Sequence, residues 1–473
     1  MFPMPGLARM VWLMAFTIAG LSGKAGDTEI LTRLGDYFKT KDLAGQQEIV
    51  AAIEADPAFN HHMVSAQLHK LELWPQQKPG RGQLGVNVGF GHGRRIAMRY
   101  PKGYTPEKAW PLIYALHSSG GSGAWYLENV VKVLGKKADD YVIAAPSNYR
   151  QTSIDAPPPF TAEHPIMIQA IRRWAHVDSN RIYAMGRSLG GYTAWIMAIM
   201  HPDIFASSIP ISSCMGPNDA DGLWEALFPN FAHLPILHIW GSRDSFPVVG
   251  LLAERHNIGG MSDLNRALSP LIRKYKLNVN DHSVTGGSHG NYRLPKDKIY
   301  QYLTKKRVAN PKKVDHTYRH LHQGRSYWLE VDSWKGPRWD NPRMKISTKK
   351  GESWSKAAGR IILPLLGRLQ GEIKGQTITV SGQNVGDMIV WFGKETVDWN
   401  LPVKIIRDNK TVFEGKLERD LGVALHHVAI GGDFERLRWA GIRIDASGKA
   451  EVVKIKEAAP LWGRKLMDNP VTH

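Results

Sequence analysis

The stretch RIYAMGRSLGGYTAWIMAIMHP, residues 181–202, reads as a buried strand, a tight turn and a buried helix in immediate succession. Arg181–Met185 fits the strand, and Tyr192–Met200 is apolar almost all round, as a central helix is. Ser188 stands at the turn, where the geometry would lift its hydroxyl above the edge of a sheet. Three glycines lack the β-carbons that would clash where strand and helix pass closely: Gly186, Gly190 and Gly191.

A second stretch, GGSHG at residues 286–290, fits the same Gly-x-Ser-x-Gly pattern. The chain holds 46 glycines, so such a match can arise by chance. Ser288 is followed by the loop sequence NYRLP rather than by a helix, and we therefore take Ser188 as the candidate nucleophile. The informative residue of the second stretch is His289, because a glycine-rich loop after the last core strand is where a base can be presented.

The region around these stretches, residues 84–307, alternates short apolar runs with amphipathic segments. The runs include PLIYALHS, DYVIAAPS, ASSIPISS and PILHIWGS, and they follow a hairpin formed by GVNVGF and RRIAMRY. Nearly continuous apolar strands alternating with helices predict a mostly parallel sheet with helices on both faces. We expect one α/β domain here.

This region resembles the α/β-hydrolase superfamily, in which nucleophile, acid and histidine follow one another in that order. The resemblance assigns the acid to Asp244, which follows the strand in LPILHIWGSRD, and it assigns the base to His289. Asp281 is the alternative acid. In this interpretation Ser188, Asp244 and His289 converge at one edge of the sheet.

The resemblance also implies an oxyanion hole made of two backbone donors. One is the amide of Leu189, directly after the nucleophile. The other comes from ALHSSGGSG, where relatives commonly have His-Gly and this chain has Ser118 in place of the glycine. Ser118 and Ser119 are both candidates, and we favour Ser119. On its own, the stretch would be interpreted as a plain glycine turn.

Within the superfamily, VDSNRIYAMGRSLGGYTAW and MHPDIFASSIPISS most resemble exported esterases of the feruloyl-esterase, acetyl-xylan-esterase and polyhydroxyalkanoate-depolymerase type. Such sequences are also described as prolyl-oligopeptidase-like. The resemblance implies a serine carboxylesterase that cleaves carbohydrate-linked or phenolic esters through an acyl-enzyme, without metal or organic cofactor. The alternatives are a serine peptidase and a non-catalytic surface protein that binds carbohydrate. The chain has no adjacent pair of glutamates, which a dipeptidase would use to hold a substrate amine.

Three aromatic residues are candidates for contact with substrate. Trp125 follows the oxyanion stretch, Trp224 lies in an insertion, and Phe246 is beside the candidate acid. The segment DAPPPF, ending at Phe160, is a candidate lid. A pocket lined with aromatic side chains suits a sugar or phenolic ester.

The N-terminal sequence predicts export. Residues 1–25 combine Arg9, an apolar run from Met10 to Leu21, and small residues in cleavage-site spacing, which is typical of a signal peptide. The run is too short for the roughly 20 residues of a membrane-spanning helix. We expect a secreted or periplasmic protein, with a helical segment over residues 27–80. The single cysteine, Cys214, allows no disulfide within the chain.

The remainder of the chain predicts a basic linker at 308–319, an antiparallel β-sandwich at 320–456 as an accessory domain, and a tail at 457–473. Among the predicted strands are RIILPLLGRLQGEI and VALHHVAIG. The net charge is +18, and residues 305–350 alone hold thirteen Lys or Arg against four Asp or Glu. Such a charge would allow contact with an anionic polysaccharide or cell surface, and a solvated basic face that aids solubility is the alternative. No motif for binding nucleic acid is present, and the sequence does not indicate an oligomeric state.

Overall fold

The computed structural model describes residues 28–89, 92–147, 162–250, 257–339 and 344–462. The predicted signal peptide and the predicted lid ending at Phe160 lie outside these residues. Within them, no helix has both the length and the apolar character needed to cross a membrane.

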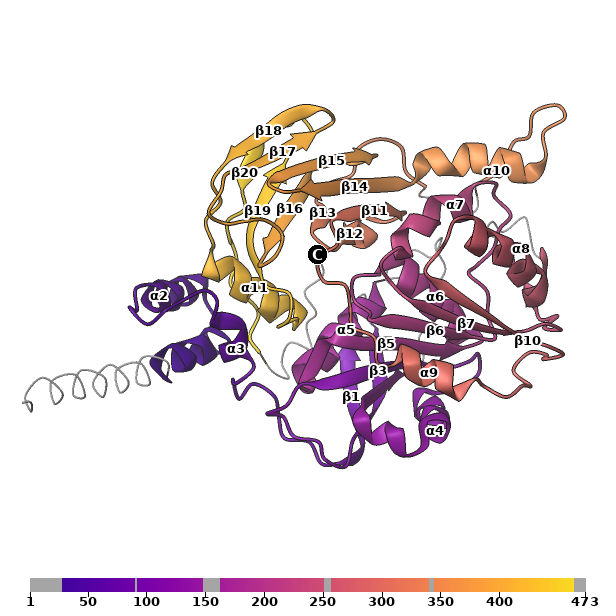
Figure 1. Cartoon of the computed structure of the whole chain (residues 1–473), viewed down its shortest axis with the longest axis horizontal. Coiled ribbons are helices and arrows are strands. Elements are labelled where there is room, and N and C mark those ends of the chain that lie inside the picture. The colour runs from indigo at the N-terminus through magenta and orange to yellow at the C-terminus, as the bar shows by residue number, and fades with distance from the viewer. Residues whose placement is uncertain (1–27, 90–91, 148–161, 251–256, 340–343, 463–473) are drawn as a thin grey trace, which may run out of the picture.

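An eight-stranded sheet forms the core of an α/β domain (Figure 1). In chain order its strands are β1 (Gly80–Asn87), β2 (Gly93–Tyr100), β3 (Trp110–Leu116), β4 (Val142–Pro146), β5 (Val177–Arg187), β6 (Ser207–Ile211), β7 (Ile236–Gly241) and β10 (Val279–Val284). They lie side by side in the order β1-β2-β4-β3-β5-β6-β7-β10, and neighbours pair in parallel from β4 through to β10. Strand β2 runs antiparallel to both of its neighbours. The predicted, mostly parallel sheet is confirmed, and the carboxyl ends of six strands meet at one edge.

Helices cover both faces of this sheet. Successive apolar side chains of β3 point to opposite faces, so both faces must be shielded from water. Ile113 packs into one apolar cluster, while Leu112 and Tyr114 pack into another on the opposite face. The first cluster is covered by α4 (Gly123–Leu134) and α9 (Lys296–Tyr302). The second is covered by α5 (Glu163–Trp174), α6 (Leu189–Met200), α7 (Leu223–Leu227) and α8 (Met261–Lys274). A minor two-stranded sheet, β8 (Pro247–Val248) and β9 (Gly259–Gly260), lies between β7 and α8 in sequence.

The C-terminal β domain contains two five-stranded sheets. One has the order β11-β14-β15-β17-β18, with β11 (Lys313–Tyr318), β14 (Gly367–Lys374), β15 (Thr377–Gln383), β17 (Val403–Arg407) and β18 (Lys410–Gly415). The other has the order β12-β13-β16-β19-β20, with β12 (Arg325–Ser326), β13 (Leu329–Val331), β16 (Met388–Gly393), β19 (Arg438–Ile444) and β20 (Ala450–Val452). The predicted C-terminal β domain is confirmed. Two details differ: β11 occupies part of the expected linker at 308–319, and β15 pairs with β17 in parallel.

Two segments predicted as strands are helices. VALHHVAIG lies within α11 (Leu421–Gly431), whose ends are fixed by the Asp420 side chain accepting a hydrogen bond from the Val423 amide and by Gly432 in a left-handed conformation. Residues 360–365 complete α10 (Trp354–Ile362) and a following 3-10 turn, and β14 begins only at Gly367. An apolar run without alternation fits a buried helix as well as a buried strand, and in α11 the flanking caps decide.

The N-terminal helices pack mainly on the C-terminal β domain. They comprise a helix over 28–37, α2 (Leu43–Glu54) and α3 (Val64–Leu68). Ile30 and Ile53 share a buried cluster with Leu425 of α11. Gln46 exchanges two hydrogen bonds with the backbone of Ala459, at 3.0 and 2.7 Å. From their place in the sequence, these helices would be expected to pack on the α/β domain that follows them. Their apolar side chains instead pack mainly on the C-terminal β domain.

The α/β domain and the C-terminal β domain meet through buried ion pairs. Arg307 Nη1 lies 2.7 Å from Asp433 Oδ2, and Arg436 Nη1 lies 2.6 Å from Asp203 Oδ2. Burial raises the pKa of Asp203, but the charges of Arg436 and Arg325 and the hydrogen bond from Arg436 together outweigh burial and lower that pKa to about 2. Asp203 is therefore ionised and paired across the interface at neutral pH.

The interface is also apolar. Four buried residues from beyond position 330 belong to the core cluster of the α/β domain: Trp339, Ala358, Ile362 and Leu366. Helix α10 seats its Gly359 against Asp221, where a β-carbon would overlap the Asp221 carbonyl oxygen. The two domains thus share a core rather than being joined by a free linker.

Candidate active site

Ser188 sits at a strained turn between β5 and α6. Its φ of 54° and ψ of −117° place a residue with a side chain in the left-handed half of the map. A β-carbon on Gly186 would overlap the Gly190 carbonyl, and one on Gly190 would overlap the carbonyl of Leu116 at the end of β3. Only glycine fits these two positions, so the sequence around Ser188 fixes the turn that exposes it.

Ser188, Asp244 and His289 form one hydrogen-bonded chain. Ser188 Oγ lies 2.9 Å from His289 Nε2, and His289 Nδ1 lies 2.9 Å from Asp244 Oδ2. Asp244 is fully buried, and its Oδ1 also accepts a hydrogen bond from the Phe246 amide at 3.1 Å. The three predicted side chains follow β5, β7 and β10, and they meet at the carboxyl edge of the sheet because those strands run parallel.

The alternative acid, Asp281, belongs to a different group. It lies on β10, where its Oδ1 is 3.1 Å from His238 Nδ1 and 2.7 Å from Trp240 Nε1. The Asp281 carboxylate is therefore bonded to His238 and Trp240 rather than to His289. The structure therefore pairs Asp244, and not Asp281, with the candidate base.

His289 is carried on a tight hairpin. Ser288 pairs with Asn291 as an isolated antiparallel bridge, and Gly290 has a φ of +78°. Arg187, the residue before Ser188, donates a hydrogen bond from Nη2 to the Gly290 carbonyl oxygen. A β-carbon at Gly290 would overlap the Arg187 guanidinium. Arg187 thus ties the strand that carries the serine to the loop that carries the histidine, a contact across 103 residues that local sequence patterns do not reveal.

Replacing Arg187 by methionine should lower kcat for a short-chain nitrophenyl ester by roughly 10- to 100-fold, because a shift of about 1 Å in a reacting group can cost that much. KM should change little, and lysine at the same position should restore part of the rate. Arg181→Met is the matched control, since Arg181 lies on the same strand, six residues before Arg187, and pairs with Asp178. Equal kcat in Arg187→Met and the unmodified protein, measured by steady-state kinetics, would contradict the positioning role.

The segment expected to form the oxyanion hole lies against the turn at Ser188. Ser118 Oγ donates a hydrogen bond to the Arg187 carbonyl oxygen at 3.2 Å. Ser118 O accepts from the Gly121 amide at 3.0 Å, and this turn leaves Ser119 exposed. Leu189 is the first residue of α6, so its amide has no acceptor within the helix. Ser119 as the second donor stays a prediction.

Residues 167–222, which contain all of β5 and the turn at Ser188, match the model of the prolyl oligopeptidase family. Elsewhere in the domain, the acid and the base follow in the order and at the strand ends expected from the resemblance. This domain has the α/β-hydrolase fold. No curated protein matches the chain.

Several solved structures are similar to about half of this chain at low identity. A thermostable esterase is 19% identical, with 48% of this chain and 63% of that chain covered and a TM-score of 0.35. A mutant feruloyl esterase module from Clostridium thermocellum, complexed with sinapinate, is 15% identical, with coverage of 49% and 94% and a TM-score of 0.34. The S-formylglutathione hydrolase FrmB from Staphylococcus aureus is 13% identical, with coverage of 48% and 97% and a TM-score of 0.35.

The three aromatic residues predicted to contact substrate lie in different places in the hydrolase domain. Phe246 is 49% exposed and stacks on His289, with ring centroids 4.5 Å apart. Trp125 is exposed in the first turn of α4, just after the oxyanion segment. Trp224 is buried on α7 in the domain core, so its prediction as a substrate contact is wrong. A large aromatic residue on a short helix packed against a sheet is held inside by its apolar area.

The described part of the hydrolase domain offers no candidate for metal or thiol chemistry. Across the described residues, no group of three or more His, Cys, Asp or Glu side chains could hold a metal ion. Cys214 is buried beside Tyr192, and burial raises the pKa of its thiol to about 11. A thiol with such a pKa stays protonated at neutral pH and is a poor nucleophile.

Proposed function

We propose that the chain is a serine carboxylesterase in which Ser188 attacks the ester carbonyl. The observation that carries this proposal is the pair of 2.9 Å hydrogen bonds that link Ser188, His289 and Asp244. His289 Nε2 takes the proton of Ser188 Oγ as the new oxygen–carbon bond forms, and gives it to the departing alkoxide as the old ester bond breaks. Water then cleaves the acyl-enzyme by the same proton transfers in reverse, which releases the acid and restores Ser188.

Asp244 orients the base in this mechanism. Its hydrogen bond to His289 Nδ1 leaves Nε2 free to face Ser188, and its negative charge stabilises the imidazolium that forms. The buried carboxylate is itself held by the Phe246 amide. Stacking of Phe246 on His289 adds a second restraint on the ring, because the two planes are inclined by only 21°.

The Leu189 amide, together with that of Ser119, would stabilise the negative oxygen of the tetrahedral intermediate. Ser188 N cannot take this role, because it donates to the Ile211 carbonyl oxygen at 2.9 Å. A preorganised donor of this kind contributes about 3 to 4 kcal/mol to lowering the barrier. The hydrogen bond from Ser118 Oγ to the Arg187 carbonyl oxygen holds the oxyanion segment against the turn at Ser188, which supports this role for the segment.

The second candidate function is peptide hydrolysis, which the match to the prolyl oligopeptidase family favours. A pair of substrates with one acyl group, a nitrophenyl ester and the corresponding nitroanilide, separates the two. We expect turnover of the ester and little of the amide, measured as kcat/KM by release of the chromophore. If proline-containing nitroanilides were cleaved faster than any ester, the result would contradict the esterase proposal and support peptide hydrolysis.

We further propose that the natural ester is carbohydrate-linked or phenolic and that the protein acts after export. The feruloyl-esterase-like sequence around Ser188, the half-exposed ring of Phe246 and the exposed ring of Trp125 support the first point. The signal-peptide features of residues 1–25 support the second.

A further inference from the structure

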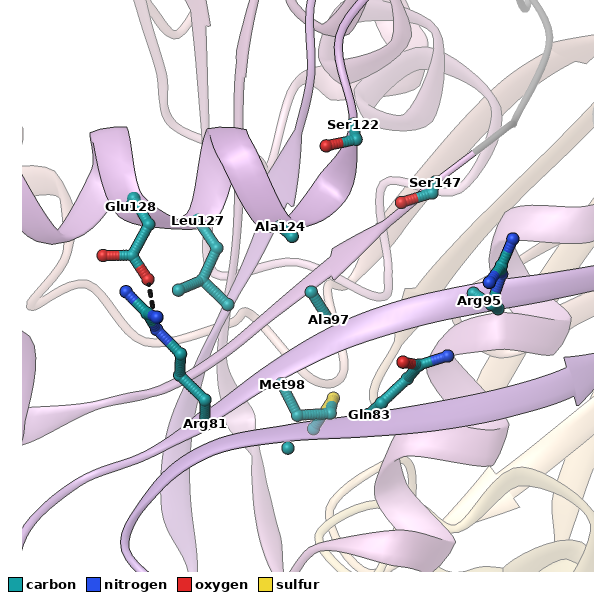
Figure 2. A pocket seen from close by; sticks show the side chains of 11 residues that line it. Arg81, Gln83, Arg95, Ala97, Met98, Ser122, Ala124, Leu127, Glu128 and Ser147 are labelled. Carbon is teal, nitrogen blue, oxygen red and sulfur yellow. Dashed lines mark hydrogen bonds and ion pairs between the residues drawn. The ribbon is translucent and has the colours of Figure 1, made fainter.

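A pocket of about 450 Å³ opens beside α4, over the edge of the sheet formed by β1 and β2 (Figure 2). Its floor is apolar, with Ala97 and Leu127 on the same face of the sheet. At one end Arg81 and Glu128 face each other, and at the other end lie Ser122, Ser147 and Arg95. The pocket therefore offers an apolar surface bounded by polar groups.

The two arginines differ in charge balance. Arg81 Nε lies 2.8 Å from Glu128 Oε1, so this end of the pocket is neutral. Arg95 is exposed, and within the described residues it has no ion-pair partner. The far end of the pocket therefore carries one uncompensated positive charge with a planar set of donors, which suits a carboxylate.

A hydroxyl group strengthens that end. Ser147 Oγ accepts a hydrogen bond from the Gly123 amide at 2.8 Å, which leaves its own hydrogen free to donate to a ligand. The Ser147 amide donates to the Arg95 carbonyl oxygen at 2.8 Å, so the serine and the arginine are held together through the backbone. The Arg95 guanidinium and the Ser147 hydroxyl are thus both available as donors at one end of the pocket.

The same end is tied to the proposed nucleophile. Ser118, whose side chain bonds to the Arg187 carbonyl oxygen, is only four residues before Ser122 of the pocket. Ser147 follows β4 and Ser188 follows β5, and these parallel strands are separated by β3 alone. Two strand spacings amount to about 10 Å. The pocket is too far away to hold the scissile ester, and it is well placed to hold a group attached to it.

We propose that this pocket is a subsite for the distal part of the ester substrate, and that this part carries a carboxylate recognised by Arg95 and Ser147. The substrate class is then an anionic ester whose scissile bond and carboxylate are about 10 Å apart. The proposal rests on the proposed esterase function and deepens it. The net charge of +18 would assist the approach of such a substrate.

The test compares two nitrophenyl esters of equal chain length, one ending in a carboxylate and the other in a methyl group. The chain is chosen to span about 10 Å between the ester and its end. For each protein the readout is the ratio of kcat/KM for the anionic ester to kcat/KM for the neutral one. Because the ratio is taken within one protein, differences in folding or in the proportion of active enzyme cancel.

We expect the unmodified protein to prefer the anionic ester, and Arg95→Gln to lower the ratio by roughly tenfold, mainly through KM. Arg95→Lys should keep part of the preference. Arg273→Gln is the matched control, because this exposed arginine lies on α8, which covers the opposite face of the sheet. Added salt should reduce the preference in the unmodified protein more than in Arg95→Gln.

Equal ratios in the unmodified protein and Arg95→Gln would overturn the subsite while leaving the esterase intact. The subsite is also overturned if Arg273→Gln lowers the ratio as much as Arg95→Gln, since the effect would then come from overall charge. Failure to hydrolyse either ester, or any shorter one, would overturn the esterase proposal itself.

Discussion

Replacing Ser188 by alanine should lower kcat for a short-chain nitrophenyl ester by on the order of 10⁴- to 10⁶-fold, as loss of the nucleophile does in serine hydrolases. The proposed base, His289, would lose the hydroxyl at 2.9 Å whose proton it takes for attack on carbon. The fold should be unaffected, because the alanine keeps the β-carbon and the hydrogen bond from the residue 188 amide to Ile211. Ester hydrolysis and labelling by a fluorophosphonate probe would measure the loss.

Ser288→Ala is the matched control for this experiment. Ser288 belongs to the second Gly-x-Ser-x-Gly sequence and adjoins His289, but it is exposed in a hairpin whose backbone pairs it with Asn291. The next helix, α9, does not start until Lys296. Most of the activity should survive in Ser288→Ala. Loss of activity and of labelling in Ser288→Ala, with retention in Ser188→Ala, would reverse the assignment.

Removing everything after residue 310 should leave a protein that does not fold. The cut would take away Trp339, Ile362 and Leu366 from the core of the hydrolase domain. Each large apolar side chain contributes about 1.5 to 3 kcal/mol when buried. The cut would also leave Arg307 without Asp433, and breaking a buried ion pair costs about 3 to 5 kcal/mol. Together these losses approach the whole net stability of about 5 to 15 kcal/mol.

The measurement is thermal unfolding followed by near-ultraviolet circular dichroism, with ester turnover as the second readout. A chain cut after Trp462 is the control, since it keeps every described contact and should unfold like the full protein. A soluble fragment ending at residue 310, with a cooperative transition and full turnover, would instead make the C-terminal β domain an accessory, as its sequence suggests.

The candidate site could be predicted because each of its residues is marked by a local pattern. Ser188 lies between an apolar strand and an apolar helix, and Asp244 and His289 each follow a strand. Their convergence then follows from the parallel sheet alone. Arg187 could not be found this way, because its partner Gly290 lies on another strand's loop and nothing in the adjacent sequence refers to it.

The differences between the predicted and the observed fold have a common physical origin. VALHHVAIG is apolar throughout, so neither a period of 2 nor one of 3.6 stands out, and the sequence of α11 is compatible with a strand. Trp224 is buried rather than at a rim because burial depends on which way a short helix faces, and only tertiary packing decides that. The packing partner of the N-terminal helices could not be predicted either, because an apolar helix face does not indicate which distant surface it packs against.

The pairing of Gln46 with Ala459 has a consequence for synthesis of the protein. These residues are 413 positions apart, and translation at about 5 to 20 residues per second separates their appearance by roughly 20 to 80 seconds. During that interval the N-terminal helices have no permanent partner, and their apolar surface must be shielded by other means. The nascent chain therefore reaches its native state only near the end of translation, and a polypeptide interrupted early would expose that surface to quality control.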